Sequence, residues 1–445
     1  MMTDYLSSRQ NVIQAPITEL NAKLEAIATA FEELWLNTDN AHPLQSLWRR
    51  QDALATNELL NFGDAVEQLH REAPDWLRGQ VDFIKKGDAG QSAGAIFEIL
   101  ALNLFSRQSC QVIPAPNSKP GFDGTLVMND GARVLVSIKN HGLSTPEKQF
   151  LSEAKTFDEE FKSQLGINNL RDLEVNILAT KHLDVAAFKS MKTDIANCLA
   201  DVTQGKHGGE LDRPYTIFLK GMTAHYGPLS AFGKSSGCRV MVPIAPNEQV
   251  NFEDAIRKGC ANLHKHTKNE TGDFCRMIIL RLSSTASIAK CHEWAQWYFS
   301  NHATDPVDVI MLYQCAVTTD TSSDKSQITH YISTITGSRF TSWQTKKDGG
   351  TRSLPNLQVL VGVISPQQPR LLLIGDDGKS VDMSEYYMYQ RADVYQKVEF
   401  SEGASVNLSN PASGIMLHAI FEQNGNQKMT LSSKAEGEKV LALLP

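Results

Sequence analysis

Two short β segments place an acid, a serine and a lysine within reach of one another. Asp123 is the second residue of the segment FDGTLVM, and Ser137 and Lys139 lie in the next segment, ARVLVSIKN. Successive side chains of a strand point to opposite faces, so Ser137 and Lys139 project from the same face. A carboxylate beside an ammonium group suits phosphodiester hydrolysis, because the acid can hold Mg²⁺ and the lysine can stabilise the charge that develops on the phosphate.

The length of the turn between the two segments decides whether Asp123 joins this face. A three-residue loop from Asn129 to Gly131, with Gly131 in a left-handed conformation, places Asp123 opposite Ser137 and beside Lys139. A two-residue loop shifts the pairing by one residue and turns Asp123 to the other face. An active site here therefore requires the odd-numbered loop or a compensating bulge.

A third candidate lies on the helix predicted just before the hairpin, GQSAGAIFEILALNLFSRQ, which is apolar on nearly every side. Glu98 stands there between Phe97 and Ile99, where a carboxylate is costly unless it faces a cleft, a metal ion or a partner. Taken singly, each candidate has an ordinary alternative. FDG is often a plain turn, Lys139 can end a solvated strand, and Glu98 can occupy an exposed stripe.

Together, the segments GAIFEILALNLF, FDG and VSIKN, in the order α-β-β-β-α-β, resemble the PD-(D/E)XK nuclease superfamily over about residues 90–200. The resemblance implies an α/β (α+β) fold with a restriction-endonuclease-like mixed sheet flanked by helices. It implies that Asp123 is the central metal-binding carboxylate and Glu98 a further metal-binding or water-positioning acid. Lys139 would orient the attacking water, and Ile138 would offer its backbone carbonyl to Mg²⁺ or Mn²⁺.

Ser137 departs from the superfamily pattern, which has Asp or Glu at this position. A serine hydroxyl is a weak, neutral ligand, so one metal site would lose a charge. Metal binding would then rest mainly on Asp123 and Glu98, and Ser137 would be a minor member of the catalytic set.

Four consecutive regions are expected from the change in periodicity along the chain. A polar helix, PEKQFLSEAKTFDEEFKSQL, and the strand EVNILAT are expected to complete the nuclease-like core after the hairpin. The helix period disappears after about residue 320. The expected regions are an acidic helical region at 1–80, the nuclease-like core at 81–204, a second α/β half at 205–320 that either continues the core or stands alone, and a β-rich C-terminal domain at 321–445.

The first region has an apolar pattern typical of a packed helix, with spacings of three and four residues from Ile17 to Leu34. This helix is expected either to pack on its own chain or to bind a second copy or another protein. The second alternative requires a large exposed apolar stripe along Ile17 to Leu34.

Candidate nucleic-acid contacts come from local basic groups, because the chain as a whole carries a net charge of -7. The predicted helix FEDAIRKGCANLHKHT carries a basic set that suits phosphate binding, and two further groups lie near Gly-containing segments. These candidates are Arg257, Lys258, Lys265, Lys234 in GKSSG, and His141. A metal cluster of Cys260, His264 and His266 on the same helix is less favoured, since no second ligand pair at zinc-site spacing follows.

No apolar stretch approaches the roughly 20 residues that a membrane span needs. The segment MMTDYLSSRQ has no signal-peptide core, and seven scattered cysteines without a CxxC pair indicate reduced thiols. A cytoplasmic protein without a membrane partner is expected.

These features favour a metal-dependent endonuclease that hydrolyses phosphodiester bonds, in the manner of a restriction or anti-phage effector. DNA is favoured over RNA by the resemblance alone. The alternative from another class is a catalytically degraded nuclease fold that binds nucleic acid or supports an assembly, and Ser137 is the feature that favours it. A third hypothesis, an adaptor built on the N-terminal helices, depends on the apolar stripe.

Overall fold

The computed structural model describes most of the chain and divides it into two compact units. Unit 1 comprises residues 1–142, 249–368 and 440–445, and unit 2 comprises residues 143–248 and 369–439. The described residues are 4–9, 15–38, 42–87, 89–116, 118–169, 173–179, 181–203, 215–219, 222–228, 237–283, 286–320, 325–346, 349–366, 371–374, 380–382, 385–390, 396–400, 405–408, 417–423 and 426–432. The units differ from the four consecutive regions expected from the sequence, because each unit is assembled from separate stretches of chain.

Unit 1 begins with a group of helices, as expected for its acidic N-terminal region. They are α1 (Ile17–Phe31), α2 (Glu33–Leu36), α3 (Pro43–Arg49), α4 (Ala53–Glu72) and α5 (Pro74–Lys86). Proline stands in the first turn of α3 and α5, where its missing N–H costs nothing, and the Asp52 carboxylate caps α4 by accepting from the Ala55 N–H.

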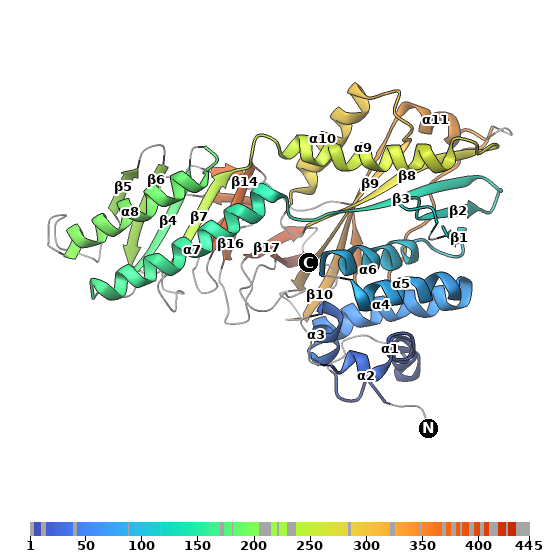
Figure 1. Cartoon of the computed structure of the whole chain (residues 1–445), viewed down its shortest axis with the longest axis horizontal. Coiled ribbons are helices and arrows are strands. Elements are labelled where there is room, and N and C mark those ends of the chain that lie inside the picture. The colour runs from blue at the N-terminus through green and yellow to red at the C-terminus, as the bar shows by residue number, and fades with distance from the viewer. Residues whose placement is uncertain are drawn as a thin grey trace. The chain divides into compact units, whose positions relative to one another are not determined.

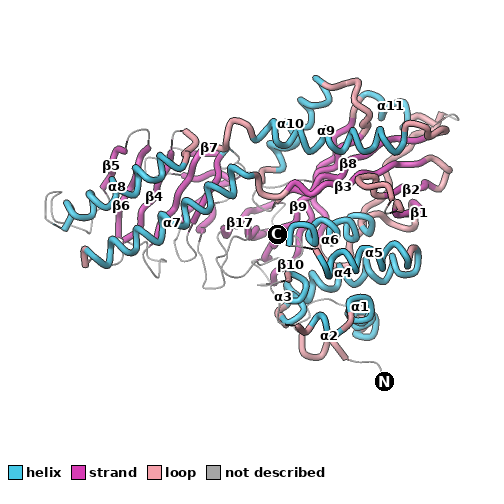
Figure 2. The backbone as a smooth tube through the Cα atoms, in the orientation of Figure 1, coloured by secondary structure: helices cyan, strands magenta, loops and turns pink. Residues whose placement is uncertain are grey.

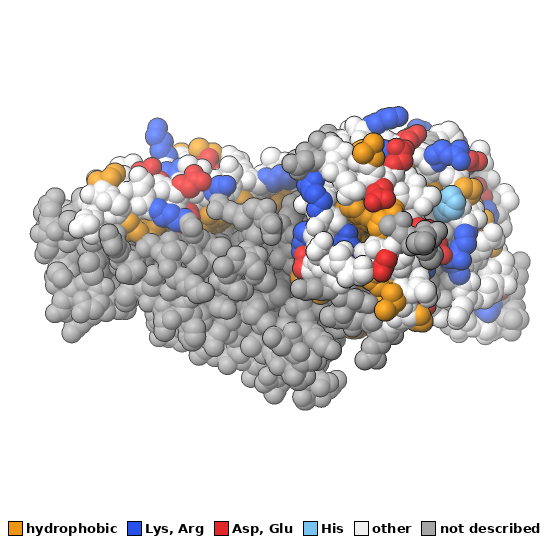
Figure 3. Space-filling view, turned by 90° about the horizontal axis from the view of Figure 1, so that it is seen from below, with side chains coloured by type: hydrophobic (Ala, Val, Ile, Leu, Met, Phe, Trp, Pro, Cys, Tyr) orange, Lys and Arg blue, Asp and Glu red, His pale blue; other side chains and the backbone are white. Residues whose placement is uncertain are grey.

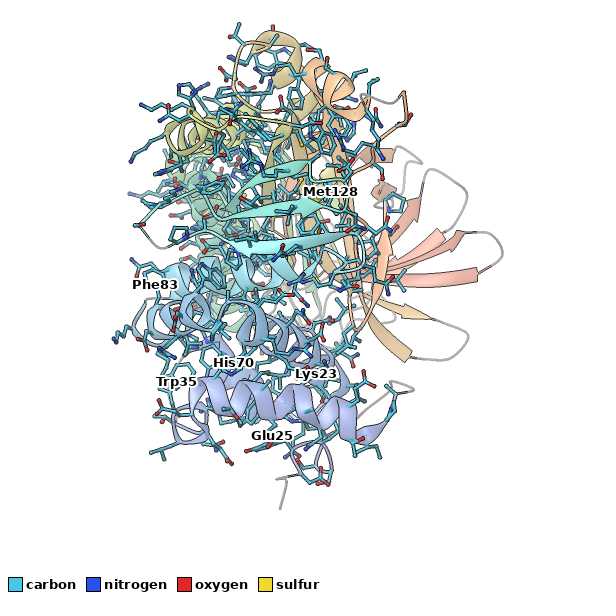
Figure 4. The ribbon with its side chains drawn as sticks, turned by 90° about the vertical axis from the view of Figure 1, so that its right-hand side faces the viewer. Lys23, Glu25, Trp35, His70, Phe83 and Met128 are labelled. Atoms are coloured by element: carbon cyan, nitrogen blue, oxygen red, sulfur yellow. The ribbon has the colours of Figure 1, made fainter. Side chains whose placement is uncertain are left out.

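The apolar pattern of α1 is directed at its own chain. Leu24 and Ile27 are fully buried, whereas Ile17 and Leu34 at the two ends are exposed. Lys23, which is labelled in Figure 4, joins α1 to α4 through ion pairs with Asp64, at 2.8 Å, and with Glu67. On the face shown in Figure 3, hydrophobic side chains form small separate patches among charged ones. The exposed stripe that the adaptor hypothesis requires is therefore not present along α1.

The core of unit 1 is a curved mixed sheet with helices on both sides (Figure 1). Its strand order is β1-β2-β3-β8-β9-β10-β11. The strands are β1 (Cys110–Pro114), β2 (Gly124–Met128), β3 (Arg133–His141), β8 (Phe274–Leu282), β9 (Val309–Asp320), β10 (Lys325–Thr336) and β11 (Val363–Ser365). Neighbours β3/β8, β8/β9 and β10/β11 run parallel, and the other neighbours run antiparallel. A mixed α/β architecture with a helix-flanked mixed sheet is thus confirmed.

Helices cover the two faces of this sheet differently. Figure 2 shows α6 (Ala89–Asn103) on one side, and α9 (Glu248–Thr267) and α10 (Ile288–Asn301) on the other. Side chains along β3 point alternately to these two faces. Leu135 points to the α9 and α10 side, where it packs in a core cluster with Ile278 of β8. Gly124 faces α6, where an added Cβ would lie 2.9 Å from the Leu102 Cδ2 atom. The sheet thus needs a glycine at the start of β2.

The helix and strand that follow β3 in this sheet are not the ones expected from the sequence. The segment EVNILAT forms β4 (Leu173–Ala179) in unit 2, and the polar helix before it is α7 (Thr145–Ile167). The parallel neighbour of β3 is β8, and the helix that precedes β8 is α9. The order α-β-β-β-α-β is therefore completed within unit 1 by α6, β1, β2, β3, α9 and β8, with unit 2 residues 143–248 inserted between β3 and α9.

Unit 2 has its own sheets and core. One sheet has the order β14-β7-β4-β6-β5, and another has the order β13-β12-β15-β16. Helices α7 and α8 (Val185–Thr203) supply Phe150, Phe157, Phe161 and Phe188 to a core with Val240 of β7. The remaining bounds are β5 (Tyr215–Leu219), β6 (Met222–Pro228), β7 (Gly237–Pro243), β12 (Leu371–Ile374), β13 (Ser380–Asp382), β14 (Tyr386–Gln390), β15 (Gln396–Phe400), β16 (Ser405–Leu408), and the hairpin β17 (Leu417–Gln423) with β18 (Asn426–Ser432).

The region after residue 320 is rich in strands but is not one domain. Strands β10 and β11 belong to unit 1, whereas residues 369–439, which include β12 to β18, are assigned to unit 2. A short helix, α11 (Ser338–Gln344), also lies in this region, where no helix was expected. Among the described residues, none of the helices combines the length and the apolar character that crossing a membrane would require.

Candidate active site

The β2–β3 hairpin has the three-residue loop on which the active-site hypothesis depends. The Met128 N–H donates to the Ala132 carbonyl at 2.7 Å, and Gly131 adopts a φ of 83°. The ladder pairs Gly124 with Val136. The predicted register is confirmed, and Gly131 is required because other residues rarely adopt this left-handed conformation.

Asp123 lies immediately before β2 and is bound to β3 through both backbone and side chain. Its N–H donates to the Val136 carbonyl at 2.9 Å, and its Oδ2 atom accepts from the Ile138 N–H at 2.5 Å. The same Oδ2 atom lies 3.8 Å from the Lys139 Nζ atom, and the Asp123 side chain is only 9% exposed. The carboxylate and the ammonium group thus meet at one end of the hairpin, as the register requires.

Lys139 also contacts the backbone group that the resemblance assigns to a metal ion. Its Nζ atom donates to the Ile138 carbonyl at 3.0 Å. The ammonium group therefore lies between the Asp123 carboxylate and the Ile138 carbonyl. A metal ion that used both oxygens would have to displace the ammonium group from this position.

Glu98 on α6 is the third member of this group. The amide of Gln80, on α5, donates to its Oε2 atom at 3.3 Å. Burial and the nearby Asp123 carboxylate raise the pKa of Glu98 to about 7, although Lys139 and the Gln80 amide oppose the shift. Two acids of this kind, one on a helix and one on a strand, influence each other only because the fold brings them together.

The pKa of Asp123 is also raised, chiefly by burial. Three groups oppose this shift: the Lys139 ammonium, the Ile138 N–H and the His266 side chain. Lys139 is thus the ammonium group that lowers the pKa of both acids. Such a site favours an additional cation, because buried carboxylates are costly when their charge is not neutralised.

The two carboxylates suit an Mg²⁺ or Mn²⁺ ion that keeps part of its water shell. They do not form a complete set of protein ligands around a metal ion. Within the part of the chain that the structure describes, no group of three or more His, Cys, Asp and Glu side chains is placed to hold a metal ion. Mg²⁺ commonly binds through one or two carboxylates, keeps several waters and takes its other ligands from substrate phosphates. Glu98 and Asp123 supply the two carboxylates that this mode needs.

Ser137 is placed differently from the weak metal ligand expected at its position. Its side chain is fully buried, and its Oγ atom donates to the Gly121 carbonyl at 2.7 Å. The hydroxyl thus holds the segment that leads into Asp123. We describe Ser137 as a positioning residue, because its only hydrogen-bonding proton is directed to the backbone.

The structure separates the proposed nucleic-acid contacts. His141 packs edge-on against Phe252 of α9, with ring centroids 5.7 Å apart. Arg257 is exposed and forms an ion pair with Asp254. Lys258 and Lys265 are exposed on α9. Lys234 lies outside the described residues.

Two residues near the site were not assigned to it from the sequence. Gln80 contacts Glu98, and His266 acts electrostatically on Asp123. The alternative cluster of Cys260, His264 and His266 does not form, because Cys260 is buried in the core, with its Sγ atom 3.7 Å from the Tyr298 hydroxyl, while His264 is exposed. His266 could have been assigned to the site only with the knowledge that α9 covers β3.

Comparison of the chain with protein-family models, with curated proteins and with solved structures finds no match. The function must therefore be inferred from the geometry and chemistry of the site.

Proposed function

We propose that this protein is a metal-dependent nuclease that hydrolyses phosphodiester bonds, with DNA as the favoured substrate. The observation that carries the proposal is the convergence of Glu98, Asp123 and Lys139 at one end of the β2–β3 hairpin. Supporting it is the order α6-β1-β2-β3-α9-β8, in which β1 to β3 are antiparallel and β8 is parallel to β3. This order resembles that of the PD-(D/E)XK core, and the preference for DNA rests on that resemblance.

The residues that would hold the metal ion are Glu98 and Asp123. When bound, a divalent cation would neutralise charge on the phosphate and activate a water molecule. Both carboxylates have raised pKa values in the protein alone, so bound cation would favour their ionised forms.

Lys139 is the residue that would meet the charge developing on the phosphate. Its Nζ atom lies 3.8 Å from the Asp123 Oδ2 atom, so a phosphate held beside Asp123 would be within its reach. Ser137 and the Ile138 N–H hold Asp123 and its preceding turn in place. These contacts would keep the carboxylate at a constant distance from the ammonium group.

The alternative is a nuclease fold that binds nucleic acid without cutting it. The observation that favours it is the contact of Lys139 with the Ile138 carbonyl, together with the burial of Ser137, which leaves two carboxylates as the acidic ligands. In that case the basic residues of α9 would bind phosphates, and the buried acids would serve only the fold.

An assay of cleavage separates the two functions. The protein is incubated with duplex DNA, single-stranded DNA and structured RNA, with Mg²⁺, with Mn²⁺ and with EDTA. Asp123→Ala and Lys139→Ala are tested beside Asp75→Ala, a control acid on α5 whose side chain is 92% exposed. We expect cleavage with a divalent cation that both site variants lose and the control retains.

Two results would count against the proposal. Cleavage that survives both Asp123→Ala and Lys139→Ala would show that the reaction occurs elsewhere. Binding of nucleic acid without cleavage under any of these conditions would favour the binding-only alternative. Circular dichroism of each variant would show that the fold is intact.

A further inference from the structure

The helix α9 brings a second set of polar side chains to the segment that leads into Asp123. Gly121 adopts a φ of 80°, and a Cβ atom added there would lie 2.1 Å from the Nδ2 atom of Asn262. Asn262 therefore lies directly against this segment. His266 follows four residues later, one helical turn along the same side of α9.

His266 has a nitrogen that the protein leaves without a partner. Its Nε2 atom is shielded from solvent and makes no hydrogen bond among the described residues. A buried polar nitrogen without a hydrogen bond costs about 1 to 3 kcal/mol, so such atoms usually have a partner that is water, an ion or a ligand. The His266 side chain also acts electrostatically on Asp123 and opposes the rise in the pKa of that carboxyl.

The chemistry of the surroundings distinguishes among the partners this nitrogen can have. Mg²⁺ prefers oxygen ligands, and His266 belongs to no metal-holding group among the residues the structure describes. A phosphate oxygen, in contrast, is a strong acceptor for an imidazole N–H. Lys258, Asn262 and His266 follow one another at intervals of four residues, so hydrogen-bond donors line one side of α9 up to the site.

We propose that His266 contacts the substrate, with its Nε2–H group donating to a non-bridging oxygen of the phosphodiester held beside Asp123. This inference rests on the proposed nuclease function and extends it by naming a further binding residue. The phosphate lies between the α9 side, with His266, and the β3 end, with Lys139. Lys258 lies two turns earlier on α9, where the neighbouring part of a nucleic-acid backbone passes.

The test compares His266→Leu with His266→Gln. Leucine fills the space without a donor, whereas glutamine keeps an N–H group. His264→Leu is the matched control, because His264 lies on the same helix and is exposed. Equilibrium binding is measured by fluorescence anisotropy in Ca²⁺ with the nucleic acid that the cleavage assay identifies, both unmodified and with one neutral methylphosphonate at the mapped cut.

We expect His266→Leu to weaken binding of the unmodified strand about tenfold to a hundredfold, as for loss of a hydrogen bond to a charged group. His266→Gln should recover most of the affinity, and His264→Leu should bind as the wild type does. On the methylphosphonate strand, His266→Leu and wild type should bind equally, because the charged acceptor is already absent.

Unchanged binding by His266→Leu would overturn the inference, and so would an equal loss on both strands, which would indicate a purely structural role. A wild-type protein that cleaves none of the nucleic acids would overturn the nuclease proposal and this inference with it. Thermal unfolding of His266→Leu should occur at or above the wild-type temperature, since the substitution removes an unpaired buried nitrogen.

Discussion

The two ends of the β2–β3 hairpin each hold an aspartate, and the protein treats them in opposite ways. At the turn, Asp130 accepts from the Arg352 Nε atom at 2.9 Å, and this hydrogen bond is the main reason why the pKa of Asp130 is lowered. At the open end, burial raises the pKa of Asp123, and its nearest ammonium nitrogen is 3.8 Å away.

This difference separates an acid that serves the fold from one that is suited to a ligand. Arg352 also contacts Asp273 at 2.9 Å and lies over the Trp343 ring, so the charges at the turn are satisfied within the chain. Glu98 and Asp123 are buried together and share Lys139. An acid that the chain does not fully compensate stays available to a cation from solution.

The largest expected effect contrasts the two aspartates directly. Asp123→Ala should lower kcat/KM for cleavage by about a thousandfold or more, because the carboxylate proposed to bind the metal ion is lost. Asp130→Ala should leave kcat/KM within a factor of about two and lower the free energy of unfolding by about 1 kcal/mol, as for a partly exposed ion pair. Initial rates and urea unfolding of the two variants measure both effects, and similar rates for the two would remove the distinction.

A second prediction concerns the pH dependence of stability. The folded-state pKa of Glu98 is about 7, above its ordinary value of 4.5. Glu98 therefore contributes up to about 3 kcal/mol to the free energy of unfolding. This contribution is fully present below about pH 4.5 and is lost as the pH rises toward 7. Urea unfolding across this range should show the loss in wild type and a smaller loss in Glu98→Gln.

Mg²⁺ provides the control for that pH dependence. At a pH above 7, the cation should stabilise the wild type more than Glu98→Gln, because it favours the ionised carboxylate in the folded state. A wild-type stability that is the same with and without Mg²⁺ would argue against cation binding at these acids.

Asp130 should affect the pH dependence of stability in the opposite direction to Glu98. Because its pKa is lowered on folding, Asp130 stabilises the fold above its ordinary pKa of 3.8, and this contribution is lost as the pH falls.

Arg352→Ala tests the other end of the hairpin. It should lower the free energy of unfolding by about 2 kcal/mol, because Asp130 and Asp273 each lose an arginine partner at 2.9 Å and the pairs are only partly shielded from solvent. Cleavage by the folded enzyme should be retained, measured below the unfolding temperature. A selective loss of cleavage would mean that the turn and the site are coupled along the hairpin.

The smallest effect is expected for Ser137→Ala. Loss of the hydrogen bond to Gly121 should cost about 1 kcal/mol of stability and reduce kcat/KM by less than about tenfold. If Ser137 were instead a metal ligand, the loss of cleavage would approach that of Asp123→Ala. The cleavage rate of Ser137→Ala, measured as a function of Mg²⁺ concentration, separates the two roles. If Ser137 only positions the site, the Mg²⁺ concentration that gives half of the maximal rate should be nearly unchanged.

Local sequence was sufficient to predict the register of the hairpin and to single out Glu98 on its apolar helix. The Asn129-Asp130-Gly131 loop sets the register, because Gly131 accepts a left-handed conformation and strand parity follows from it. The apolar neighbours of Glu98 correctly pointed to a buried carboxylate, since that helix leaves little polar surface. These features depend on residues only a few positions apart.

Residues that come from distant parts of the chain could not be assigned in the same way. Both α7 and α9 carry an apolar face, and β4 and β8 are both apolar strands, so either pair could follow β3. The entropy of closing a long loop rises slowly, by only about 0.6 kcal/mol for each doubling of length, so an insertion of this size does not prevent β3 from pairing with β8. His266 and its helix consequently escaped assignment to the site.

The sequence by itself determined the odd-numbered turn, the shared strand face of Ser137 and Lys139, and the acid on an apolar helix, because each follows from backbone geometry over a short span. The tertiary structure alone decided that β8 pairs with β3, that the Ser137 hydroxyl donates to the backbone, and that His266 acts electrostatically on Asp123. Those outcomes depend on which buried surfaces pack together, and packing joins residues that sequence spacing leaves unrelated.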